Sequence, residues 1–99
     1  MKLRAIAHSR AGDKGRVVNL SVIAYNEADY PRLAAAVTAE RVKEHFADIA
    51  AGDVQRFEIP SLGALNFVFP RAPRDSVTRS LALDAHGKSL SSALLDLEI

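Results

Sequence analysis

The segment Val17–Tyr25 alternates between two kinds of position. Its even-numbered residues, from Val18 to Ala24, are all apolar, whereas the odd-numbered ones include Asn19. A period of two places every second side chain on the same face of a β-strand. The segment is therefore expected to be a strand with one well-buried face. The apolar run Leu3–His8 before it is expected to pair with it as a long-looped hairpin.

Two helical regions are predicted from different signals. Asp29 and Pro31 form a typical helix start, and the apolar stripe that follows changes phase near Thr38. Thr38 is the expected N-cap of a longer amphipathic helix over Ala39–Ala51, which Gly52 is expected to end. Near the C-terminus, four apolar residues at helical spacing predict a final helix: Leu90, Ala93, Leu94 and Leu97.

Three further strands are expected between these helices. Val54–Ile59 is predicted to turn Phe57 and Ile59 inward. Ala64–Phe69 and Val77–Asp84 follow, the second after an irregular loop with two prolines. This order predicts an α+β open sandwich, in which two main helices cover one face of a mainly antiparallel sheet of about five strands. The other face remains for solvent, a ligand or another chain.

Size and composition narrow the class of protein. A chain of 99 residues has room for one core, so residues 1–99 are expected to form a single domain. The net charge of +1 argues against a protein devoted to nucleic acid, and the sequence has no cysteine for disulfides or zinc. No apolar run approaches the roughly 18 residues of a membrane span, and the first one is too short for a signal peptide. A cytoplasmic, self-associating protein without a membrane partner is expected.

The most polar stretch lies between the first two expected strands. It combines two glycines, an acid and three bases: Arg10, Gly12, Asp13, Lys14, Gly15 and Arg16. Glycines at positive φ expose consecutive backbone N–H groups as an anion-binding nest, and the bases add charge-assisted donors for a carboxylate or phosphate. The loop is therefore a candidate anion or docking site. The alternative is a solvated turn in which Asp13 pairs with one of the bases.

Other motifs are weaker. Gly12–Gly15 has the GXXG spelling of an RNA-binding KH loop, but it lies between strands rather than helices. Gly87–Ser89 is similar to the end of a phosphate-binding P-loop, but the glycine required five positions earlier is missing. The three histidines lack metal-ligand spacing, and His8 and Ser9 point to opposite faces of a strand, which excludes a triad with Asp13. No metal and no cofactor are expected.

Three polar residues interrupt otherwise apolar strands: Asn19, Asn66 and Arg79. An inward polar group costs stability unless it is hydrogen-bonded. These residues are therefore expected either to face solvent or to belong to a site, and they join the candidate site residues of the polar loop.

Several blocks of the sequence resemble the AtuA-like domain family, named after acyclic terpene utilisation protein A. The likeness extends over essentially the whole chain and is strongest in the blocks Arg10–Ala24, Thr38–Lys43, Leu62–Val68 and Thr78–Leu81. The family motif falls on seven positions: Gly12, Asp13, Lys14, Gly15, Asn19, Asn66 and Arg79. Ala11 stands where the family usually has serine.

The resemblance implies a ferredoxin-like fold and a connection with the breakdown of acyclic terpenes and related acyl-CoA compounds. In this family the domain commonly forms the C-terminal part of a larger protein, and it also occurs as a separate chain. An accessory or interaction domain is therefore expected, working with a larger chain of the same family or as a homo-oligomer. The alternative is a small enzyme acting on an acyl-CoA or other anionic metabolite. In that case Lys14 or Arg16 binds the anion, and His8 or Asp13 moves a proton.

Overall fold

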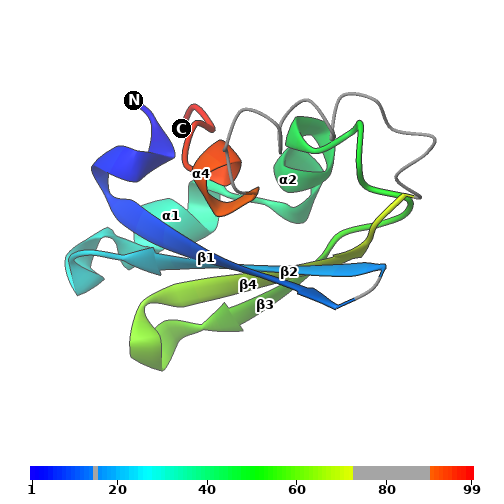
Figure 1. Ribbon diagram of the computed structural model, residues 1–99. Helices are drawn as coiled ribbons and strands as arrows, with labels where there is room; N and C mark the ends of the chain where they lie inside the picture. The colour runs from blue at the N-terminus through cyan, green and yellow to red at the C-terminus, as the bar shows by residue number, and fades with distance from the viewer. Residues whose placement is uncertain (15, 73–89) are drawn as a thin grey trace.

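The chain folds as an antiparallel sheet with helices on one side, as the computed structural model in Figure 1 shows. The structure describes residues 1–14, 16–72 and 90–99, with Asp13 and Lys14 described by their backbone alone. The strands are β1 (Ala7–Lys14), β2 (Val17–Ala24), β3 (Gln55–Ile59) and β4 (Ala64–Pro70), in the spatial order β1-β2-β4-β3. The helices are α1 (Tyr30–Ala36), α2 (Ala39–His45) and α4 (Leu90–Leu94), with the 3-10 turns η1 (Leu3–Ala5), η2 (Glu27–Asp29) and η3 (Pro60–Leu62). The expected strand Val77–Asp84 lies outside the described residues.

The core lies between the sheet and the helices. The alternation predicted for β2 is confirmed, since Val18, Leu20 and Val22 are completely buried while their neighbours in sequence are more exposed. The same layer contains side chains from β4 and from the described helices α1, α2 and α4 and their ends: Leu33, Val37, Val42, Leu65, Phe67, Phe69, Leu90 and Leu94. Each buried side chain of this size contributes roughly 1.5–3 kcal/mol through the hydrophobic effect. This packing is what holds the helices on one face of the sheet.

The first hairpin is tighter than predicted. The expected strand Leu3–His8 is wrong, because β1 begins at Ala7 and continues to Lys14 in unbroken register with β2. The residues before β1 form η1 instead, where the N–H of Leu3 donates to the carbonyl of Leu97 at 2.8 Å. Most of the polar stretch is therefore strand rather than loop.

The helix predicted over Ala39–Ala51 begins where expected but is shorter than predicted. The hydroxyl of Thr38 accepts a backbone N–H of the first turn of α2 at 3.1 Å, which makes it the N-cap. Helix α2 ends at His45, because the chain then turns to the sheet and the N–H of Ala51 donates to the carbonyl of Pro70 at 2.8 Å. At Gly52 a Cβ would come within 3.0 Å of the Pro70 ring. This close approach, rather than a helix end, accounts for the glycine.

Strand β3 is oriented opposite to the prediction. Phe57 and Ile59 were expected inward, but Phe57 is 50% exposed and Ile59 is half-buried on the side away from the helices. Arg56 takes the helix side instead. Its guanidinium donates to the carbonyls of Ala34 at 2.7 Å and Val37 at 2.9 Å, at the end of α1. These bonds fix which face of β3 meets the core.

The burial predicted for the C-terminal stripe is confirmed, because Leu90, Leu94 and Leu97 are buried in the core and Ala93 is partly buried. The predicted helix is too long, because α4 ends at Leu94 and Leu97 lies beyond it. Within the described ranges, none of the helices has the length and apolar character needed to cross a membrane.

We predict that adding a methyl group destabilises the fold at one glycine and not at another. Gly63 has a φ of 61°, in the left-handed region, so Gly63→Ala should lower the free energy of unfolding by about 1 kcal/mol. Gly12 is extended, and an added Cβ would meet the Asn19 Cβ at an ordinary 3.9 Å. Gly12→Ala should therefore leave that free energy unchanged or raise it by about 0.5 kcal/mol. Urea unfolding followed by circular dichroism measures both, and equal losses would contradict the backbone conformations described here.

Candidate functional site

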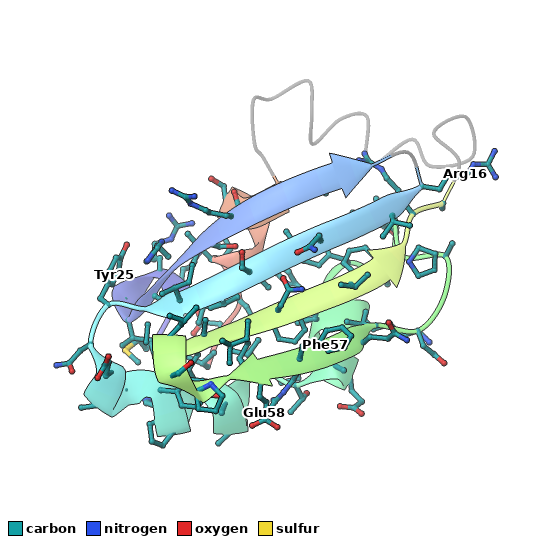
Figure 2. All side chains as sticks on the ribbon, turned by 90° about the horizontal axis from the view of Figure 1, so that it is seen from below. Arg16, Tyr25, Phe57 and Glu58 are labelled. Atoms are coloured by element: carbon teal, nitrogen blue, oxygen red, sulfur yellow. The ribbon has the colours of Figure 1, made fainter. Side chains whose placement is uncertain are left out.

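One face of the sheet is left uncovered by the helices (Figure 1), and Figure 2 views the molecule from that side. By register and burial it consists of the even-numbered positions of β1 (8–12) and β4 (64–70) and the odd-numbered positions of β2 (17–23) and β3 (55–59). We call this surface the open face. Its central row of paired residues runs across all four strands through Arg10, Ser21, Asn66 and Phe57.

A shallow hollow of about 320 Å³ lies on the open face between β1 and β2. Its side-chain lining combines a guanidinium, an amide, a hydroxyl and an apolar wall: Arg10, Asn19, Ser21 and Val17. Gly12 also lines it and is the direct cross-strand neighbour of Asn19. Because Gly12 has no side chain, the space beside the Asn19 amide stays open.

The described side chains of the open face include one cation, Arg10, and no carboxylate. Arg10 takes part in none of the ion pairs among the described residues. Glu58, the acidic residue of β3, is paired with buried Leu65 and so belongs to the helix side. A charge that has no protein partner is available to a ligand of opposite sign.

The structure brings several predicted site residues together and leaves others apart. Arg10, Gly12 and Asn19 meet at the hollow. Asn66 is the cross-strand partner of Ser21. It lies on the same face, on the next strand across the sheet. Asn19 and Asn66 therefore lie on the uncovered face, as expected of polar strand residues that either face solvent or belong to a site.

The structure describes only some of the remaining predicted site residues. Arg16 is exposed at the end of the first hairpin, where its carbonyl accepts the N–H of Arg71. Gly15 and Arg79 lie outside the described residues, as do the side chains of Asp13 and Lys14.

The predicted anion nest is wrong at Gly12. This residue is extended within β1 and paired with Asn19, and among the described glycines Gly63 alone has a positive φ. A strand turns successive N–H groups in opposite directions, so they cannot converge on one anion as in a nest. The donors at the hollow are therefore side chains, the Arg10 guanidinium and the Asn19 amide.

Two residues of the open face were not singled out from the sequence. Ser21 occupies the same odd-numbered series as Asn19, so the period-two pattern contained the signal that could have found it. Phe57 was assigned to the core, and its exposure follows from the bonds of Arg56 to α1, which the sequence does not reveal.

The histidines lie away from the hollow. The ring of His8 is on the open face but stacks on Tyr25, with the ring centroids 5.3 Å apart, and does not line the hollow. His45 is on the helix side, where its Nε2 lies 2.7 Å from the carbonyl oxygen of Ala93. Among the described residues, no group of three or more histidines and acids is placed to hold a metal ion.

These features define an α+β open sandwich of the ferredoxin-like class, with one sheet face buried and the other presenting a polar hollow. A family model described as the AtuA ferredoxin-like domain matches residues 1–99. The chain belongs to this family, which confirms both the resemblance and the fold class, although four strands are described where about five were expected. No curated protein and no solved structure matches the chain.

A shifted carboxyl pKa lies outside the open face, between α2 and β3. Lys43 Nζ is 2.6 Å from Asp53 Oδ1, and this hydrogen bond together with the nearby positive charge lowers the pKa of Asp53. The pair is well exposed, so it contributes little to stability. That contribution is present above the pKa of Asp53 in the unfolded chain and is lost as the pH falls through the lowered folded-state pKa.

We predict that Lys43→Gln raises the pKa of Asp53 back to its ordinary value, because both lowering influences come from the ammonium group. Carboxyl carbon shifts followed by NMR across acidic pH measure this directly. Lys43→Arg is the matched control and should keep the pKa lowered. An unchanged pKa in Lys43→Gln would contradict the ion pair.

Proposed function

We propose that this chain is a non-catalytic interaction domain whose open face binds an acidic segment of a larger protein. The observation that carries the proposal is the hollow beside Arg10, whose guanidinium has no ion-pair partner among the described residues. A guanidinium binds a carboxylate through two parallel hydrogen bonds, and the neighbouring Asn19 and Ser21 offer further polar contacts.

Exposed apolar side chains support a protein partner. Val17, at the wall of the hollow, is 45% exposed, and Phe57 at the far end of the central row is 50% exposed. Interfaces between proteins combine aromatic and arginine anchors with a polar surround. An acidic segment with apolar neighbours would therefore find complementary groups along the central row of the open face.

Family membership suggests the identity of the larger protein. The chain belongs to the AtuA ferredoxin-like domain family. The resemblance described above implies that this domain commonly forms the C-terminal part of a larger protein and also occurs as a separate chain. The proposed partner is therefore a larger chain of the same family, in the breakdown of acyclic terpenes or related acyl-CoA compounds. A small anionic metabolite bound at the same hollow is the alternative, and an enzyme would need a proton-transfer group there. Of the two candidates for that role, His8 does not line the hollow, and the side chain of Asp13 lies outside the described residues.

We predict that a peptide of alternating glutamate and leucine shifts the backbone amide NMR signals of Arg10, Gly12 and Asn19. Arg10→Gln should weaken binding about tenfold, because a charge-assisted hydrogen bond is worth roughly 1.5 kcal/mol. Gly12→Val should weaken it by filling the hollow while keeping the fold, since the added Cβ makes an ordinary contact. Arg32→Gln, which changes an exposed arginine on α1, is the matched control and should have no effect.

The same titration separates the alternatives. If acetyl-CoA shifts these amide signals and the peptide does not, the ligand of the hollow is a small metabolite and not a protein. Peptide-induced shifts confined to other surfaces would contradict the proposed site. In the native host, a larger chain of the same family should co-purify with the wild-type domain and be lost with Arg10→Gln and Gly12→Val.

A further inference from the structure

Among residues 1–14, 16–72 and 90–99, strand β3 lies at an edge of the sheet and its outer side has no pairing partner. It pairs with β4 alone, and no other backbone hydrogen bond among the described residues involves it. Figure 2 shows β3 along the border of the sheet, with Phe57 and Glu58 labelled on it. An exposed strand edge is a template for pairing with another strand.

The sequence of β3 is complementary to itself in antiparallel register. When two copies pair about a two-fold axis at Phe57, Arg56 lies opposite the partner subunit's Glu58 on the helix side. By symmetry, Glu58 lies opposite the partner subunit's Arg56. Opposite charges directly across an antiparallel pair stabilise it, whereas like charges in the same place destabilise it.

The charged pair is already positioned within one copy. Arg56 Nη1 is held by the carbonyls of Ala34 and Val37, and Nη2 lies 3.7 Å from Glu58 Oε2. The Glu58 side chain is 59% exposed, so its carboxylate retains room for a second cation. Two ion pairs between Arg56 and the partner subunit's Glu58, one on each side of the axis, would form without moving the Arg56 side chain.

On the open face the same register brings the two exposed aromatic rings together. Phe57 is 50% exposed in one copy and would lie against the partner subunit's Phe57. Aromatic cross-strand pairs are among the stabilising pairs of antiparallel sheets. The residues next to the axis are therefore complementary to those of the second copy on both faces of the sheet. A contact between two identical surfaces requires this.

We propose that the chain forms a two-fold homodimer in which the β3 strands pair antiparallel with Phe57 on the axis. The sheet then runs continuously through both copies, and the two open faces form one surface with a hollow toward each end. This proposal does not rest on the interaction with a larger protein, because it uses the β3 edge rather than the β1–β2 hollow, and Phe57 is the residue that the two proposed surfaces share.

Cysteine cross-linking tests the register, since the chain has no cysteine of its own. The register places Gln55 opposite the partner subunit's Ile59, where opposing Cα atoms are about 5 Å apart, within reach of a disulfide. Two copies of Gln55 would be roughly 13 Å apart, beyond that reach. A mixture of Gln55→Cys and Ile59→Cys proteins should therefore give about tenfold more mixed disulfide than either protein gives alone. A statistical mixture of disulfides would overturn the register.

Charge reversal tests the pairing independently. Glu58→Arg places like charges across the axis and should convert the dimer to monomer in analytical ultracentrifugation. Mixing it with Arg56→Glu should restore a dimer, and circular dichroism of Arg56→Glu checks that the fold survives loss of the bonds to α1. A wild-type chain that sediments as a monomer at every concentration would overturn the dimer.

The binding of an acidic segment and the homodimer can each be disproved without the other. Arg10→Gln should leave the dimer intact, and Glu58→Arg should leave binding of the acidic peptide intact.

Discussion

The period-two burial of β2 is the constraint on which the rest of the structure depends. This strand lies inside the sheet, paired with β1 on one side and β4 on the other. Its even-numbered residues, such as Leu20, are completely buried against the helices. A slip of one residue in its register would carry Asn19 and Ser21 into the core and Leu20 into solvent. The register that forms the core is therefore also the register that presents the polar hollow on the open face.

Arginines in this protein serve two different purposes. Arg56 and Arg41 close the fold, because their guanidinium groups donate to backbone carbonyls at the end of α1. Arg41 also bonds the carbonyl of Glu98 and so holds the C-terminal segment against α2. Arg10, by contrast, has no ion-pair partner among the described residues and lies beside a hollow. This contrast, which composition alone does not reveal, separates the arginine that we propose for binding from the two that hold the fold together.

The parts of the fold that sequence predicted are those where a local signal and the tertiary structure agree. The alternation of β2 and the N-cap at Thr38 are local signals of this kind. The polar stretch 9–14 was mistaken for a loop, because it lacks the apolar alternation of β2, and a strand with one face toward solvent tolerates polar residues on that face. Phe57 was misplaced because what orients β3 is the contact of Arg56 with α1, which is distant in sequence. Three predicted site residues lie at the hollow: Arg10, predicted as a charge-assisted donor, Asn19, predicted as a polar residue of a strand, and Gly12. Gly12 was predicted to form a backbone nest at positive φ, and that part of the prediction is wrong.

The central claim is that one face of the sheet is buried and the other is free to bind. Solvent paramagnetic relaxation enhancement of side-chain methyl groups, measured by NMR on the isolated chain, tests this most directly. A dissolved paramagnetic agent should broaden the methyl signals of Val17, Ile23 and Val68 while those of Val18, Val22 and Leu65 stay sharp, since exposure alternates along β2 and β4. Equal protection of both sets would contradict the claim, because it would mean that the open face is covered as fully as the core.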